Sequence, residues 1–346
     1  MSYKPLTEIY VHSPDQYYGE YPRRISSGNA VISEFMINMT NAFHVETMDV
    51  FNMIYQILRN DKQISLLFAA LPQYLKEKYA SSLLAREIEA ICDTEDRHYD
   101  IRECARAITN RNRPSVYSSL IIGYDRILKR ENFTIDEPAD IRHIYDAYIP
   151  SSFISRKPDG KHFRKEEAII RDTNAKILFK GGYPESAVNN LLSSAIRFLK
   201  REDVELICRS CIFFFFVADT YPFYNCNRIL STYVFCRLLS KTLEPITCFR
   251  MNQSLLAYRT ELQNCFTICN EPSNMGDLTP ILLKLLEVIL HAQAESLNDL
   301  NQKNALADEI TAAMLKQEDR FDHASMSVIS VLIMSSIYSD AGIPMN

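Results

Sequence analysis

Residues 211–241, CIFFFFVADTYPFYNCNRILSTYVFCRLLSK, decide the fold of this chain. Four consecutive phenylalanines beginning at Phe213 make a helix apolar on every side, and such a helix has no face that can meet water. After a polar elbow at residues 220–228, Leu230 and Val234 begin an apolar series with a helical period. The stretch predicts two buried helices joined by the elbow. Because the first N–H groups of a helix attract anions, the elbow is a candidate phosphate site.

Composition describes an ordinary globular protein. The chain has 346 residues, of which 47% are hydrophobic and 23% are charged. Its 8 glycines argue against a sheet-and-turn protein and against a glycine-rich nucleotide loop of the Rossmann or Walker type. The net charge of −5, without any basic run, argues against a nucleic-acid partner.

The cysteines and the apolar runs bear on location and metal binding. The nine cysteines are scattered, which is typical of a reducing compartment and predicts a cytoplasmic protein. Cys208 and Cys211 form a lone CxxC with no second pair, so they predict two core thiols rather than a metal site. The apolar runs are shorter than the ~20 residues of a membrane span, so we expect no membrane partner.

Helical periodicity extends over most of the chain, and one segment alternates as a strand pair does. The sequence predicts an extended arm at residues 1–28 and a β-hairpin within residues 163–180. It predicts an all-α fold apart from that hairpin. The helices are expected at residues 30–58, 81–92, 116–129, 136–149, 184–199, from residue 276 and from residue 324.

At the elbow the sequence resembles the motif of the Fic family, whose members mostly transfer AMP from ATP to a protein hydroxyl. The family's motif is His-Pro-Phe-x-Asp/Glu-Gly-Asn-Gly/Lys-Arg-x-x-Arg. Residues 221–232 read YPFYNCNRILST, with no insertion or deletion. Pro222, Phe223 and Asn227 match the motif, and the other specified positions differ.

The flanking segments resemble a bacterial subgroup of the same family from about residue 135 to residue 290. Residues 163–180 look like the family's flap, a hairpin that holds a target peptide by strand addition. The resemblance therefore implies target contacts by Phe163, Arg164, Ile169 and Ile170. More faintly, residues 85–91 resemble the family's inhibitory helix, with Glu89 at the inhibitory position.

The resemblance implies a Fic-type helical bundle with a β-hairpin flap and helical extensions at both ends. Active members of the family use ATP and Mg²⁺. The expected division is an N-terminal arm and helical region at 1–130 that includes the inhibitory-like helix 81–92, a Fic core at 131–245, and a C-terminal helical region at 246–346 whose tail would begin a winged helix.

Two replacements remove catalytic chemistry. Tyr221 stands where the family has the histidine that accepts a proton, and a tyrosine with a pKa near ~10 remains protonated at neutral pH. Asn225 stands where the family has the acidic ligand of Mg²⁺, and an amide keeps an oxygen but loses the charge.

The remaining replacements alter the phosphate cradle. Cys226 and Arg228 occupy the two glycine positions, where a positive φ would cost ~1–2 kcal/mol each. Ile229 and Thr232 replace the arginines that hold phosphates. Asn227 is expected to cap the following helix. Arg228 is the one new cation, and it is able to bind an anion.

Three functions remain open from the sequence. The first is a Fic-fold protein that has lost AMP transfer and acts as a binding or regulatory module, with a peptide partner at the hairpin edge. The second is a nucleotidyl or phosphoryl transferase with altered chemistry that uses Tyr221 and Arg228. The third is a DNA-binding regulator that uses the C-terminal tail. Whether the chain forms a homodimer stays open.

Overall fold

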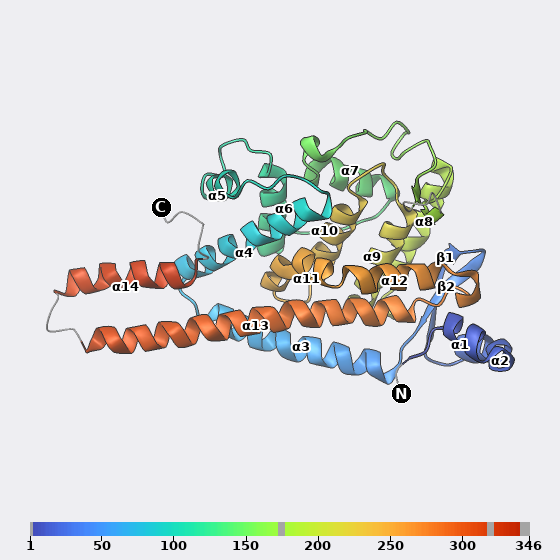
Figure 1. The fold of residues 1–346 in the computed structure, drawn as a ribbon, viewed down its shortest axis with the longest axis horizontal. Helices are drawn as coiled ribbons and strands as arrows, with labels where there is room; N and C mark the ends of the chain where they lie inside the picture. The colour runs from blue at the N-terminus through green and yellow to red at the C-terminus, as the bar shows by residue number, and fades with distance from the viewer. Residues whose placement is uncertain (1–2, 172–176, 317–321, 340–346) are drawn as a thin grey trace.

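The computed structural model describes residues 3–171, 177–316 and 322–339. Within them the protein consists mainly of helices, together with two separate two-stranded hairpins (Figure 1). The helices are α1 (Leu6–His12), α2 (Pro14–Ile25), α3 (Met48–Ala69), α4 (Gln73–Thr94), α5 (Ile101–Thr109), α6 (Ser118–Leu128), α7 (Pro138–Tyr148), α8 (Glu185–Leu199), α9 (Leu206–Thr220), α10 (Asn227–Leu239), α11 (Met251–Ala257), α12 (Arg259–Asn270), α13 (Thr279–Leu315) and α14 (His323–Ile337). The strands are β1 (Ala30–Ile37), β2 (Thr40–Val45), β3 (Ile169–Arg171) and β4 (Ile177–Lys180).

Helix α9 lies in the middle of the molecule and is surrounded by other elements, as its phenylalanines require (Figure 1). Its aromatic rings contact different neighbours, so each face of the helix has a partner. The ring pairs, with the distance between centroids, are Phe216 with Phe35 of β1 (4.0 Å), Phe214 with Phe235 of α10 (5.3 Å), and Phe215 with Phe266 of α12 (4.9 Å). The predicted pair of buried helices around an elbow is confirmed.

The helix predicted from residue 30 was wrong over its first half, because residues 30–45 form the antiparallel hairpin of β1 and β2. Inward and outward residues alternate along β1, and Phe35 points into the core. The strands join through Asn38 and Met39, both of which have positive φ (48° and 63°). Such two-residue turns usually contain glycine, so the sequence lacked the usual signal.

The extended arm predicted for residues 1–28 was also wrong, because α1 and α2 occupy most of it. Two of its prolines begin helices, since Pro5 precedes α1 and Pro14 is the first residue of α2, and Pro22 lies within α2. A buried ion pair of 2.8 Å between Arg24 and Asp277 fixes α2 to the segment that leads into α13.

The predicted flap is confirmed as an antiparallel hairpin, in which Ile169 is opposite Lys180 and Ile170 is opposite Phe179. Its strands are shorter than expected from residues 163–180, and the turn at residues 172–176 lies outside the described residues. The chain on either side is held close, since the N–H of Gly181 donates to the carbonyl of Ala168 at 3.0 Å.

In its described residues, the C-terminal region is mainly helical, as predicted. Gly276 has a φ of 77°, and its neighbours Asp277 and Leu278 lead directly into the 37-residue helix α13. Helix α14 packs back against α13 and α4. A winged helix at this end stays a prediction. None of the helices in the described ranges has the length and apolar character needed to cross a bilayer.

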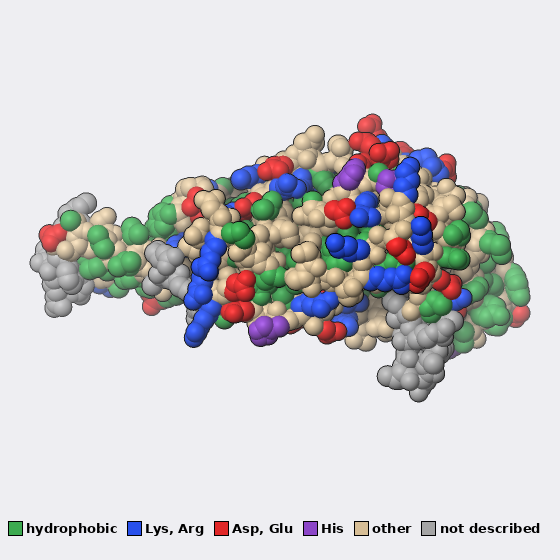
Figure 2. Space-filling model, turned by 90° about the horizontal axis from the view of Figure 1, so that it is seen from above, with side chains coloured by type: hydrophobic (Ala, Val, Ile, Leu, Met, Phe, Trp, Pro, Cys, Tyr) green, Lys and Arg blue, Asp and Glu red, His purple; other side chains and the backbone are tan. Residues whose placement is uncertain are grey.

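The face seen in Figure 2 carries lysine and arginine side chains interspersed with acidic ones, and no continuous basic patch covers it. Apolar side chains gather instead at the projecting tip formed by the end of α13 and α14 (Figure 2). Leu315 and Val328 there are 58% and 60% exposed.

Candidate functional site

The elbow begins where α9 ends. Tyr221 adopts the left-handed conformation with a φ of 50°, which turns the chain out of the helix, and its N–H still donates to the carbonyl of Val217 at 3.3 Å. Cys226, at the second turn of the elbow, has a φ of 60° and precedes α10. The glycine-type conformation whose cost was considered above is therefore present at Cys226. Arg228 is helical, so the strain expected at that position is absent.

Asn227 closes the elbow from inside. Its Oδ1 accepts from the N–H of Phe223 at 2.9 Å, and its Nδ2 donates to the carbonyl of the same residue at 2.8 Å. The expected role as a helix cap was wrong, since this side chain makes no capping hydrogen bond to α10. An amide can satisfy both backbone groups of a buried residue because it carries a donor and an acceptor.

Two residues assigned to target binding are buried instead. Phe163 is fully buried, and its ring lies edge-on to Phe223 at 5.6 Å. Arg164 is 1% exposed and its guanidinium donates to the carbonyls of Tyr221 (2.8 Å), Gly182 (2.7 Å) and Glu166 (2.6 Å). The prediction of target contacts by Phe163 and Arg164 is therefore corrected: both residues hold the elbow in place. Ile169 is half-buried, and the side chain of Ile170 lies outside the described residues.

Tyr221, at the position of the family's proton acceptor, has the wrong acidity for that role. Burial raises the pKa of its hydroxyl above the ordinary value of 10, and Asn227 opposes the shift only in part. A general base must be deprotonated near the working pH, so a tyrosine whose pKa is raised does not accept protons at neutral pH.

Asn225, at the position of the Mg²⁺ ligand, is held by other residues. Its side-chain amide lies 2.9 Å from the hydroxyl of Tyr145 and 2.5 Å from Oγ of Ser155. It does not line the cavity described below. Cys226 and Ile229 are likewise buried, 2% and 0% exposed, and serve the core.

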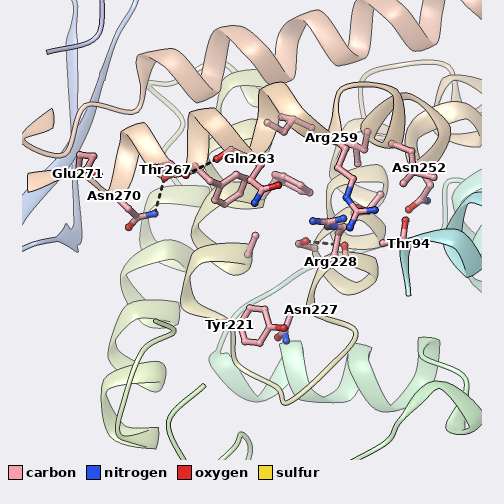
Figure 3. Close-up of a pocket in the computed structure, with 18 residues that line it drawn as sticks. Thr94, Tyr221, Asn227, Arg228, Asn252, Arg259, Gln263, Thr267, Asn270 and Glu271 are labelled. Atoms are coloured by element: carbon pink, nitrogen blue, oxygen red, sulfur yellow. Dashed lines mark hydrogen bonds between the residues drawn. The ribbon is translucent and has the colours of Figure 1, made fainter. Parts of the chain in front are cut away.

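A cavity of about 480 Å³ lies between the elbow and helices α11 and α12 (Figure 3). Of the predicted site residues, Tyr221, Asn227, Arg228 and Thr232 line it. Thr232 is 1% exposed, and its Oγ1 has no hydrogen-bond partner in the described structure. The volume of the cavity is within the range of small-molecule sites, roughly 300–1,000 Å³.

Arg259, at the start of α12, was missed by the sequence analysis. Its side chain and that of Arg228 point into the same end of the cavity from opposite walls (Figure 3). Burial and the neighbouring Arg259 lower the pKa of Arg228. Arg259 belongs to no motif, so only the tertiary structure reveals this pairing.

Three carboxylates of α4 and its end differ in environment. Glu89, the residue at the inhibitory position, is exposed and does not line the cavity, so the structure does not bring it to Thr232. Glu87 is fully buried and structural. Glu95, which the sequence analysis also missed, lies near Cys226 and Arg228: burial raises its pKa and these neighbours oppose the shift.

The elbow does not fit a Mg²⁺ ion. The amide of Asn225 is engaged elsewhere, and the one carboxylate that lines the cavity, Glu271, lies at the end opposite Arg228 (Figure 3). Across residues 3–171, 177–316 and 322–339, no group of three or more His, Cys, Asp or Glu side chains is placed to hold a metal. Mg²⁺ is normally held by one or two carboxylates together with substrate phosphates.

No protein-family model and no curated protein matches this sequence. Among solved structures, a Fic family protein from Desulfovibrio desulfuricans G20 has a TM-score of 0.50 and 13% identity, over 73% of this chain and 75% of that protein. A Fic domain containing signaling protein from Bacteroides thetaiotaomicron VPI-5482 has a TM-score of 0.44 and 9% identity, over 70% of this chain and 97% of that protein. The first likeness shows the fold: this chain has the Fic-type fold, as the elbow and its flanks predicted.

Proposed function

We propose that this protein is a Fic-fold binding module that no longer transfers AMP and keeps a ligand cavity at its elbow. The observation that carries the proposal is the state of Tyr221. Its hydroxyl stands where the family has a proton acceptor, and burial raises its pKa above 10. Loss of a positioned general base typically lowers a rate by ~10²–10⁴.

The other replacements support the same conclusion. The amide of Asn225 is bound to Tyr145 and Ser155, and Ile229 is packed in the core where the family has an arginine. The cavity nevertheless persists at about 480 Å³. A fold that keeps its cavity while other residues occupy the family's catalytic positions is suited to binding a ligand without turnover.

The hairpin of β3 and β4 supplies a second binding surface in this proposal. Its two strands pair with each other and with no other strand in the described residues, so an extended peptide can add along an edge. Phe163 and Arg164 are buried and unavailable to such a peptide, whereas Ile169 and Ile170 stay proposed contacts.

A labelling experiment tests the proposal. The whole chain is incubated with Mg²⁺, ATP labelled at the α-phosphate, and a protein extract as acceptor. We expect no label on any protein, including the chain itself. Label that disappears in Tyr221→Phe would contradict the proposal and support the transferase with altered chemistry. Label that persists in this variant would also contradict it and would exclude the tyrosine hydroxyl from the reaction.

A further inference from the structure

Two guanidinium groups share one end of the elbow cavity. Arg228 projects from the first turn of α10, and Arg259 projects from the first turn of α12 on the opposite wall (Figure 3). In the described part of the chain, neither side chain makes an ion pair within 4.0 Å or a side-chain hydrogen bond to another protein group. Each can therefore direct its donors into the cavity.

This pairing is unfavourable without a ligand. Arginine stays charged at all ordinary pH values, so the two like charges repel one another, and the repulsion is stronger in a partly enclosed cavity than in water. Glu95 attracts Arg228 and offsets part of this repulsion, but it does not line the cavity, and its carboxylate also hydrogen-bonds with Cys226. An anion between the guanidinium groups would replace repulsion with attraction.

The rest of the lining indicates what the anion is attached to. Six apolar side chains contribute to the lining: Phe214, Ala218, Leu255, Leu256, Leu262 and Phe266. Thr267, Asn270 and Glu271 lie at the end opposite the arginines (Figure 3). The carboxylate of Glu271 disfavours an anion there, so the two ends fix the direction of the ligand.

One further polar atom in the wall lacks a partner. Oγ1 of Thr232 is buried and unsatisfied, and Thr232 is one turn along α10 from Arg228. A buried hydroxyl without a hydrogen bond costs about 1–3 kcal/mol. An acceptor oxygen on a ligand would satisfy it.

We propose that the elbow cavity binds an organic anion whose carboxylate or phosphate group lies between Arg228 and Arg259 and whose apolar body packs against Phe214 and Phe266. This inference rests on the proposed function, because it names the ligand class of the same cavity. Two guanidinium groups match one such head group. A metal-bound triphosphate is a poorer match, because the elbow lacks carboxylates to hold its metal.

Calorimetric titration of the whole chain with three matched probes tests the proposal. The probes are 2-naphthoate, 2-naphthyl phosphate and the neutral 2-naphthamide. We expect at least one anion to bind at least about tenfold more tightly than the amide, because charge-assisted hydrogen bonds are the stronger kind. The preference between the two anions identifies a carboxylate or a phosphate as the natural head group.

Variants assign the binding to the arginines. Arg228→Gln and Arg259→Gln should each weaken the bound anion about tenfold or more while the affinity for 2-naphthamide stays unchanged. Arg113→Gln, a change of an exposed arginine outside the cavity, should have no effect. Without ligand, Arg259→Gln should melt at the same or a higher temperature, because removing this charge relieves its repulsion of Arg228.

Three results would overturn this inference: no binding of either anion up to about 1 mM, equal binding of the amide, or anion binding unaffected by both arginine variants. The labelling experiment is separate. Label on a protein together with arginine-dependent anion binding would overturn the proposed function alone. Absence of label together with any of the three results would overturn the ligand class alone.

Discussion

The guanidinium of Arg164 donates to the carbonyl of Tyr221 at 2.8 Å and so joins the segment before the flap hairpin to the elbow between α9 and α10. The backbone N–H of Arg164 also donates to the carbonyl of Pro222 at 3.2 Å. The left-handed conformation of Tyr221, which is uncommon for a residue with a side chain, is thus held from outside the elbow. Flap and elbow therefore form one structural unit.

Replacing Arg164 should destabilise the whole fold. Arg164→Ala leaves the carbonyls of Tyr221, Gly182 and Glu166 without their donors, so we expect the free energy of unfolding to fall by about 3 kcal/mol or more. Arg164→Lys should recover only part of the lost stability, because an ammonium group cannot reproduce the planar set of donors of a guanidinium. Urea unfolding measures both. A loss below about 0.5 kcal/mol, the scale of a surface change such as Arg113→Ala, would refute this role.

Substitutions of Glu87 and of Glu89 should have sharply different effects on stability, although only one residue separates the two on α4. Oε1 of Glu87 accepts from Tyr124 and from both the backbone and the side chain of Asn252, at 2.7–2.9 Å. We expect Glu87→Ala to lower the free energy of unfolding by about 3 kcal/mol or more. Glu87→Gln should destabilise less, since its carbonyl oxygen still accepts from Tyr124 and Asn252 and only the acceptor for Gln253 is lost.

Glu89→Ala is the matched control for this pair, because its side chain is exposed. It should change stability by no more than about 0.5 kcal/mol. It should also leave the labelling result unchanged, since no cavity residue depends on it. Activation of AMP transfer by Glu89→Ala would mean that the inhibitory role implied by the resemblance is real.

Restoring the histidine alone should not restore AMP transfer. In Tyr221→His the missing base returns, but Asn225 still provides no carboxylate and Ile229 remains in the core. Adding Asn225→Asp supplies a charge at a position that contacts Tyr145 and Ser155 rather than the cavity. We expect both variants to leave protein acceptors unlabelled by ATP. Label above the wild-type background in Tyr221→His would show that the base alone limits the reaction.

His44 should make the fold sensitive to acid. Its ring is fully buried, its two nitrogens have no hydrogen-bond partner in the described structure, and burial followed by the charge of Arg201 lowers its pKa from 6.5 to about 4. The unfolded chain binds a proton near pH 6.5 and the folded chain does not. Stability is therefore complete above about pH 6.5 and is lost as the pH falls toward about 4.

The loss attributable to His44 approaches about 3 kcal/mol at the acid end of that window. His44→Phe keeps an aromatic ring against Phe198 and removes the titration. Urea unfolding at several pH values should show a shallower decline for this variant than for the wild type between about pH 6.5 and about pH 4. Parallel declines would contradict the assignment.

The sequence was sufficient for features set by local composition. The all-round apolar character of α9 demanded a central position, and the elbow followed because polar residues separate two apolar series. The hairpin of β1 and β2 was missed because Asn38 and Met39 make its turn without glycine. The arm was misread because prolines both interrupt helices and begin them.

The site depended on contacts between distant segments, which periodicity does not report. Arg259 approaches Arg228 only after α12 folds over the elbow. Glu87 and Glu89 lie two residues apart, about 200° around a helix, so one is buried and the other exposed, and the apolar pattern did not decide which of them faced the core. Arg164 was predicted to contact a target peptide because it lies beside the hairpin in the sequence. The sequence does not indicate that its side chain is buried.

The central claim is that the elbow cavity binds an anion that the protein does not transform. A crystal structure of the whole chain with 2-naphthyl phosphate tests it most directly. The account predicts an intact phosphate ester, with its phosphate between Arg228 and Arg259 and its ring against Phe214 and Phe266. A phosphoryl group attached to Tyr221, a ligand bound elsewhere, or a cavity that excludes the probe would contradict the account.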